Sequence, residues 1–525
     1  MNSTLFKNQI AFVIVMLFTT LFCIFGISTA RAFVQNVDLE IETSRLVRPV
    51  KNYYDYRLAL AESSNQTILQ TILNKNVNTT SSMENAHSIP VVVYHGIVDK
   101  ADGRNATIEQ VKEQLYGLHN AGYKTVSLED YVLFTQGQKE LPEKSFLLTF
   151  DDGRKDSLKV DPVLKALNYQ AIMFVITSKI GSSEYYLSMS ELKSMQNSNR
   201  WNIQSHGHNA HDQYVIDQDG NKGNFYSNKL WLINENRLET TEEFTSRVHN
   251  DLAESKRILE EEGFNVTTIA FPFGDFGQFT KNFPEAESIV MNLSNEMYTI
   301  SFYQQYKKQI STFERDTKFN SNQAFAKRIT ISPDNNKTSL VQLFEGGKTK
   351  TMPFQDNFTN SNQWETNWGL STVQNNELLV SSTDKTTGGA AFLVGSSDWK
   401  NYRLDASVQW LMGDTFTIHT RVYNANNFLT CDFSGSQVQI RSKINGQTKV
   451  LASKKITEAF DPAGAKLSIE VKDNTISCFI NDKEIIATTL KDIPFQNGGI
   501  GFSTWDKELG NSAILINNLA VKELQ

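Results

Sequence analysis

Short apolar runs alternate with amphipathic stretches through much of this chain. Five runs have the length and composition of buried strands, namely Val91–Tyr94, Ser145–Phe150, Ala171–Ile176, Trp201–Gln204 and Thr268–Phe271. The clearest helix begins at Thr240, where Thr-Thr-Glu-Glu has the spacing of a capping box, and its apolar face carries Phe244, Val248, Leu252 and Leu259. Strands that alternate with helices predict an α/β fold with parallel strands.

From residue 351 to residue 525 the pattern changes to short segments in which apolar and polar residues alternate, as in Ala406–Trp410. Turn-forming pairs such as Asn445-Gly446 and Asn497-Gly498 separate these segments. Strands of this kind predict an all-β sandwich as a second domain. Five of the seven tryptophans lie here, and they either pack in the core or, where exposed, stack on sugar rings: Trp364, Trp368, Trp399, Trp410 and Trp505.

The N-terminal segment predicts export from the cytoplasm. An almost unbroken apolar stretch runs from Ile10 to Ile27 and is long enough, or nearly so, to cross a bilayer. Ala30-Arg31-Ala32 resembles a cleavage site, so residues 1–33 are either a removed signal peptide or a retained anchor, and the length of the stretch favours the anchor. Residues 34–87 end in a polar linker and predict a stalk. We therefore expect the rest of the chain on the extracellular face of the cell envelope, anchored to the membrane or secreted.

The charge and the cysteine content of the chain limit the kinds of partner and of cross-link that we expect. The 51 basic and 58 acidic residues give a net charge of −7, and no basic run interleaves with aromatic residues, so we expect no nucleic-acid partner. The 3 cysteines are too few for a disulfide scaffold, and none has zinc-ligand spacing. Cys23 falls in the apolar N-terminal stretch, whereas Cys431 and Cys478 either form a disulfide or remain buried thiols.

Acids and histidines stand where three of the predicted strands end. Asp151 and Asp152 directly follow one strand, and His95 ends another. The segment Ser205–His211, with three of the eight histidines, follows a third. Because strand ends and the loops after them form one face of an α/β barrel, these side chains should meet there. One acid and two histidines make up the ligand set of an open metal site, which leaves the second acid as a base and His95 as an acid for the leaving group.

At these residues the chain resembles the polysaccharide deacetylase family, also called the NodB homology domain or carbohydrate esterase family 4. Thr149–Gly153 is similar to the first family motif, which implies that Asp151 is the catalytic base and Asp152 a metal ligand. Tyr94-His95-Gly96-Ile97 is similar to the last motif, moved to the start of the domain as in the circularly permuted biofilm-exopolysaccharide branch. This placement implies that His95 is the catalytic acid.

The histidine-rich segment resembles the second family motif. The resemblance implies that His206 and His211 complete the metal site, five residues apart where the family usually has four, as we associate with the same branch. His208 remains a rival ligand. The cation implied is Zn²⁺, or another divalent metal such as Co²⁺ or Ni²⁺.

Ile269–Gly274 resembles the third family motif, which implies that Pro272 and Phe273 form a groove wall. A backbone N–H near Phe273 would help to hold the oxyanion. The arginine that usually leads this motif is missing, and Arg328 is a candidate to replace it.

The resemblance implies a distorted (β/α) barrel at residues 88–350. It also implies a metal-dependent N-deacetylase that removes acetyl groups from an N-acetylhexosamine-containing extracellular polysaccharide, either a biofilm exopolysaccharide or a cell-wall glycan. The alternative is a catalytically inactive glycan-binding protein of the cell surface. A glycosidase fits less well, because two neighbouring acids on one loop are poorly placed to flank a glycosidic bond. Residues 351–525 weakly resemble a concanavalin-like lectin or glucanase sandwich, jelly-roll-like, which makes them a candidate carbohydrate-binding domain.

Overall fold

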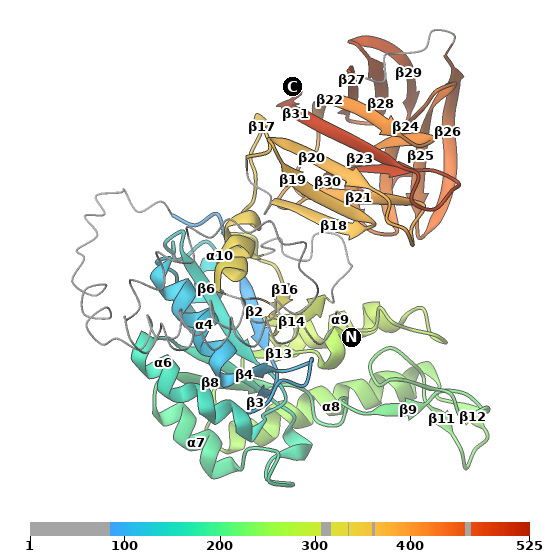
Figure 1. Ribbon diagram of the computed structural model, residues 1–525. Helices are drawn as coiled ribbons and strands as arrows, with labels where there is room; N and C mark the ends of the chain where they lie inside the picture. The colour runs from blue at the N-terminus through green and yellow to red at the C-terminus, as the bar shows by residue number, and fades with distance from the viewer. Residues whose placement is uncertain (1–84, 306–316, 334, 336, 360–362, 457–463) are drawn as a thin grey trace, which may run out of the picture. The chain divides into compact units, whose positions relative to one another are not determined.

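The computed structural model describes residues 85–305, 317–333, 335, 337–359, 363–456 and 464–525. The apolar N-terminal segment and most of the predicted stalk lie outside these residues, so the expected anchor or signal peptide stays a prediction. In the part of the chain that is described, no helix is both long and apolar enough to span a bilayer. The described residues form an α/β barrel followed by an all-β domain (Figure 1).

Parallel strands close into a ring in the order β2, β16, β14, β13, β8, β7 and β6, and the pairing of β6 with β2 completes it. β5 (Lys124–Thr125) adds to β6 outside the ring. The ring strands are β2 (Val91–Tyr94), β6 (Ser145–Phe150), β7 (Ala171–Val175), β8 (Trp201–Ser205), β13 (Thr268–Ala270), β14 (Ile300–Gln305) and β16 (Phe325–Thr330). The five predicted strands are all present, each with ends within one residue of the prediction.

The helices of the barrel region are α4 (Ile108–Asn120), α5 (Leu128–Thr135), α6 (Asp161–Leu167), α7 (Met189–Asn197), α8 (Thr241–Glu261), α9 (Ala286–Met297) and α10 (Lys337–Gly346). α8 begins as predicted: the Glu243 amide donates to Thr240 Oγ1 at 3.2 Å, and the Thr240 amide donates to the Glu243 carboxylate at 2.7 Å. The four predicted apolar residues of its face are fully buried. In Figure 1, α4, α6, α7 and α8 lie around the outside of the strands.

Shorter elements make up the connections of this region. Antiparallel pairs join β1 (Ser88–Ile89) to β15 (Thr317–Lys318), β9 (Gln213–Val215) to β10 (Lys222–Asn224) and β11 (Trp231–Leu232) to β12 (Arg237–Leu238). A parallel pair joins β3 (Ile97–Val98) to β4 (Ala106–Thr107). Single 3₁₀ turns are η1 (Lys155–Val160), η2 (Thr177–Lys179) and η3 (Pro272–Gly274).

Two antiparallel sheets form the second region, which confirms the all-β prediction. One sheet has the order β19 (Leu370–Gln374), β20 (Glu377–Ser381), β31 (Ala513–Glu523), β22 (Tyr402–Met412), β27 (Ala465–Lys472), β28 (Thr475–Ile480) and β29 (Lys483–Thr489), with β17 (Phe354–Asp356) beside β31. The seven-stranded sheet has the order β18 (Trp364–Trp368), β21 (Gly388–Leu393), β30 (Gly499–Trp505), β23 (Thr415–Asn424), β24 (Asn427–Ser434), β25 (Gln437–Ile444) and β26 (Gln447–Lys455).

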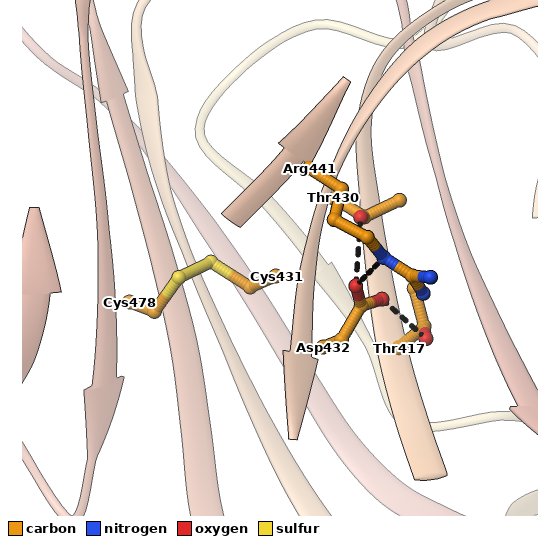
Figure 2. Close-up of a disulfide and its surroundings, with 6 residues drawn as sticks. All are labelled: Thr417, Thr430, Cys431, Asp432, Arg441 and Cys478. Carbon is orange, nitrogen blue, oxygen red and sulfur yellow. Dashed lines mark hydrogen bonds and ion pairs between the residues drawn. A yellow bond between two sulfur atoms is a disulfide. The ribbon is translucent and has the colours of Figure 1, made fainter. Parts of the chain in front are cut away.

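The two sheets share one apolar core. Leu404 and Ile469 from one sheet and Phe416 from the other are fully buried in it. Cys431 of β24 and Cys478 of β28 form a disulfide, with their Cα atoms 6.0 Å apart, which links the sheets through this core (Figure 2). Of the two alternatives that the sequence left open, the structure therefore has the disulfide.

The tryptophans of the β domain divide between the two alternatives given by the sequence. Trp364 and Trp399 are buried in the core, and Trp410 is half-buried against it. Trp368 and Trp505 instead expose 37% and 44% of their surface. Core packing thus accounts for three of these residues and leaves two facing solvent.

Candidate active site

Loops at the carboxyl ends of four barrel strands carry the predicted site residues. His95 directly follows β2, and Asp151 and Asp152 directly follow β6. His206 follows β8, and the turn η3 follows β13 after one residue. All pairings between the ring strands are parallel, so these four ends lie on the same face of the barrel.

Two of these loops hold a non-glycine residue in the left-handed region of backbone space. The φ angle is 72° at Asp152 and 59° at Phe273. Such a conformation costs free energy for a residue with a Cβ and persists where the surrounding structure enforces it. The backbone strain therefore lies at the two loops that present a carboxylate and a groove-wall residue.

Asp152, His206 and His211 form a group that could hold a metal ion, with one ligand atom from each within 4.8 Å of the others. Asp152 Oδ1 lies 3.0 Å from His211 Nε2 and 3.5 Å from His206 Nε2. His206 Nδ1 lies 2.6 Å from the carbonyl oxygen of Ala270. Because a carbonyl only accepts, Nδ1 carries the proton, and the lone pair of a neutral His206 is on Nε2, facing the carboxylate. An acid and an imidazole lone pair that face each other suit a cation between them.

The electrostatics of this group keep the acid ionised. Burial opposes the charged form of Asp152, but His206 and His211 outweigh it and hold the pKa of that carboxyl well below its usual range. Burial also opposes the charged form of His211, yet Asp152 raises the pKa of that imidazole above its usual value. The negative charge available to a cation is thus on Asp152.

Asp151 is bound by a different partner. Arg328 of β16 donates two hydrogen bonds to it, from Nη1 to Oδ1 at 2.6 Å and from Nη2 to Oδ2 at 2.7 Å. Both side chains are fully buried, so the guanidinium contacts Asp151 and does not line an open groove. Burial disfavours the carboxylate, but Arg328 and then His206 lower the pKa of Asp151 below its usual value.

His95 lies beside Asp151, with its Nε2 3.8 Å from Asp151 Oδ2 and 31% of its side chain exposed. Burial lowers the pKa of His95, although Asp151 and Asp152 act in the opposite direction. A Cβ at the next residue, Gly96, would lie 2.4 Å from the guanidinium of Arg154, so a side chain there would displace that arginine. This close packing explains the glycine of the Tyr-His-Gly-Ile segment.

The third-motif segment stands next to the metal-ligand candidates. The ring of Phe273 lies 4.7 Å from that of His211, between centroids. Phe273 is half-buried, whereas Pro272 is buried. Phe273 therefore lies beside a candidate metal ligand, and its role as a groove wall stays a prediction.

His208 points elsewhere. Its Nδ1 lies 2.9 Å from Thr177 Oγ1, and it is not in the group of Asp152, His206 and His211. Its backbone amide donates to Asp251 of α8 at 3.1 Å. The structure thus separates His208 from the two histidines that flank it in sequence.

Asp251 is a residue of the site region that the sequence reasoning missed. Its buried carboxylate accepts from the amides of His208 and Asn209, at 3.1 and 2.6 Å, and from the hydroxyl of Tyr226 at 2.6 Å. It fixes the loop that carries His206 and His211. The sequence holds one indication of this role. Asp251 lies on the apolar face of α8, next to Leu252, where a carboxylate without a hydrogen-bond partner would be destabilising.

Known proteins are similar to this chain over part of its length. Residues 138–286 match the model of the polysaccharide deacetylase family. The chain is 26% identical over 203 residues to a poly-beta-1,6-N-acetyl-D-glucosamine N-deacetylase of Escherichia coli (strain K12), across 35% of this chain and 30% of that protein. It is 29% identical over 154 residues to the enzyme of the same name from Staphylococcus epidermidis, across 26% of this chain and 52% of that one.

A de-N-acetylase from Aggregatibacter actinomycetemcomitans is similar in structure, with a TM-score of 0.42 and 18% identity over 49% of this chain and 99% of that one. The relatives named above are matched over only 30% and 52% of their own lengths. Their activities are therefore a starting point for a proposal about this chain.

Proposed function

Because residues 138–286 belong to the polysaccharide deacetylase family, we propose that this chain is a metal-dependent N-deacetylase of an N-acetylhexosamine polysaccharide, with poly-β-1,6-N-acetylglucosamine as the first substrate to test. One observation carries the proposal: the two adjacent acids differ in the groups that bind them most closely. Asp151 is bound by buried Arg328, whereas Asp152 faces two imidazoles. A base and a ligand are thereby distinguished on one loop.

Asp152, His206 and His211 would hold the cation, since one carboxylate and two imidazoles leave coordination positions open for water and substrate. Zn²⁺ suits this ligand set, and Co²⁺ or Ni²⁺ are the substitutes to test. The bound cation supplies polarisation of the acetyl carbonyl and acidification of water. The hydrogen bond from His206 Nδ1 to Ala270 orients its ring for this role.

Proton transfer falls to Asp151 and His95. Asp151, kept ionised by Arg328, would take a proton from water as the oxygen attacks the acetyl carbon. A backbone N–H near Phe273 would stabilise the oxyanion. His95, 3.8 Å from Asp151, would protonate the sugar nitrogen as the C–N bond breaks, which releases acetate and an amine. Arg328 would act as a positioning residue through Asp151.

Acetate release from purified poly-β-1,6-N-acetylglucosamine tests the function. A chelator should abolish release, and Zn²⁺ or Co²⁺ should restore it. Asp152→Ala, His206→Ala and His211→Ala should each lose bound metal and activity. His208→Ala is the matched control and should keep most of both, because His208 bonds Thr177.

Two results would contradict the proposal. Loss of metal in His208→Ala with retention in His211→Ala would overturn the ligand set. If the folded, metal-loaded protein binds the polymer but releases no acetate, it is instead the catalytically inactive glycan-binding protein that the sequence left as the alternative. Shortened polymer chains would indicate a glycosidase.

An extracellular substrate requires export of this chain. The apolar stretch Ile10–Ile27, outside the described residues, would provide it. We therefore propose a location at the outer face of the cell envelope, with the membrane as a partner through that stretch. Fractionation of cells, with detection of the intact N-terminus, tests this location.

A further inference from the structure

We propose that the outer face of the seven-stranded sheet in the β domain binds polysaccharide, at a site built from Trp368, Trp505, Thr417, Asp432 and Arg441. The aromatic and polar side chains of this face suit the binding of pyranose rings. That the polymer is the N-acetylhexosamine polysaccharide rests on the function proposed above.

Pairing in the sheet puts these side chains on one face. Trp505 pairs with Gly388 and Ser503 with Ala390, and residues paired across antiparallel strands point to the same side. Phe502, between them, lies in the core, so Ser503 and Trp505 point outward. Trp368 pairs with Ala390 and shares that outward side.

The two exposed indoles are neighbours. A Cβ at Gly388 would lie 2.4 Å from Cη2 of Trp368, so the Trp368 ring occupies the space above this glycine. Trp505 is the cross-strand partner of the same glycine. Two large aromatic rings, 37% and 44% exposed, are therefore presented on the same face of the sheet, from the two strands that flank β21. Exposed apolar surface of this kind marks a binding site more often than a plain surface.

A row of polar side chains adjoins the indoles on the same face. Ser503, Thr417 and Asp432 are successive partners across β30, β23 and β24. Asp432 accepts hydrogen bonds from Thr417 at 2.7 Å, from Thr430 at 3.3 Å and from Arg441 Nε (Figure 2). Asp432 is buried, so its orientation is fixed before any ligand arrives.

One side chain of this row can still donate hydrogen bonds to a ligand. Arg441 uses Nε for Asp432, while 37% of its side chain is exposed. His419 is buried beside it, with Nε2 2.8 Å from Ser503 Oγ, and within the described residues its Nδ1 has no hydrogen-bond partner. The rings of Phe392 and Phe428 pack against His419, so Arg441 is the member of this row that a ligand can reach.

A pyranose matches this combination. Its C–H face stacks on an indole, and its hydroxyl and acetamido groups exchange hydrogen bonds with hydroxyl, carboxylate and guanidinium groups. A face for another protein would need a larger apolar area than two indoles provide. The site would hold the chain on its polymer while the barrel acts on it.

Binding of the full chain to poly-β-1,6-N-acetylglucosamine, with a chelator present to prevent deacetylation, tests this site. Trp368→Ala and Trp505→Ala should each weaken binding about tenfold, through loss of a stacked ring. Trp505→Phe should restore most of the affinity because it keeps a ring. Tyr423→Ala removes a 67% exposed aromatic residue of the same domain that we do not place in the site, and it should bind like the parent protein.

Affinity in both alanine variants equal to that of the parent protein would overturn the site, whatever the result for acetate release. Equal binding to cellulose would overturn the N-acetylhexosamine assignment. Altered self-association in sedimentation, without loss of polymer binding, would show instead that this face joins two copies of the chain. Absence of acetate release with metal present would contradict the proposed function and leave the binding result to be read separately.

Discussion

The barrel and the β domain each hold an arginine bonded to an aspartate, and the two pairs differ in setting. Arg328 and Asp151 are both fully buried at the end of barrel strands, next to strained loops. Arg441 and Asp432 lie on two paired strands of a sheet, and the guanidinium reaches solvent. The first arrangement fixes the charge of a single carboxylate. The second leaves donors available on an otherwise ordered surface.

The difference shows what each kind of site requires. Loops from several strands must converge before an acid, a base and metal ligands can lie within reach of one bond. A binding surface for a repeating polymer needs only side chains at every second residue of neighbouring strands. The following predictions test this contrast.

The largest expected effect is on catalysis in the barrel. His95→Asn should lower the rate of acetate release by about 10²–10⁴, because the amine loses its proton donor. An acid must be protonated to act, so the parent rate should fall as pH rises through the pKa of His95, and the variant should lack this alkaline limb. The matched control is His119→Asn, an exposed histidine on α4. Near-normal turnover in a folded, metal-loaded His95→Asn protein would exclude His95 as the acid.

Removal of either arginine should destabilise the region that contains it, and the loss of unfolding free energy should be larger in the barrel than in the β domain. Arg328→Met should lower the free energy of unfolding of the barrel by about 3–5 kcal/mol, since Asp151 would remain buried and unpaired. Arg441→Met should cost the β domain less than this, because the guanidinium is 37% exposed and the buried Asp432 keeps its hydrogen bond from Thr417. Urea unfolding of each region measures both. Equal losses would remove the contrast.

The disulfide should matter for the β domain alone. Joint replacement of Cys431 and Cys478 by alanine should cost this domain about 4 kcal/mol, the chain-entropy estimate for a sequence separation of 47 residues. The barrel should unfold at its usual urea concentration. Reduction of the parent protein should reproduce the effect, and a shift of the barrel transition as well would show that the two regions unfold together.

His419 should give the β domain a pH dependence. Burial, with smaller effects from Arg441 and Lys443, lowers the pKa of His419 to about 3 in the folded protein. The unfolded chain has a value near 6.5 and binds more protons below it, so stability is complete above pH ~6.5 and falls as pH decreases toward 3, by up to about 1.4 kcal/mol per pH unit. Unfolding midpoints between pH 6.5 and 5, where few carboxylates titrate, measure the slope. His419→Gln should flatten it, and an unchanged slope would assign it to other groups.

Much of the barrel is predictable from sequence because its strands are continuous apolar runs. β14 and β16 were missed, and in β16 the reason is physical: Lys327 and Arg328 are charged residues in a buried strand. Arg328 is tolerated there because it is paired with Asp151, which directly follows another strand and is 177 residues away. No local pattern reveals such a partner. Asp251 was missed for a similar reason, since its role depends on how α8 packs.

His95, Asp151, Asp152 and His206 could be proposed from sequence because each stands at the end of a recognisable strand. The strand pattern could not predict which tryptophans are exposed. Trp364 and Thr366 share the face of the sheet that packs on the core, and a period of two would place Trp368 there too. A register shift between Thr366 and Trp368 turns the last indole outward. One bulge thus decides whether a tryptophan is core or surface.

The 177-residue separation of Asp151 and Arg328 also bears on the order of synthesis. Asp151 is synthesised long before Arg328. The strands β2 and β6, which pair with each other, are also synthesised before Arg328. A chain that ends before residue 328 therefore lacks both the arginine that binds Asp151 and the strand that lies between β2 and β14 in the ring. Insertion of β16 supplies the cation and closes the ring in the same event. The strand that completes the barrel and the arginine that holds the proposed base in place are thus a single element of this protein.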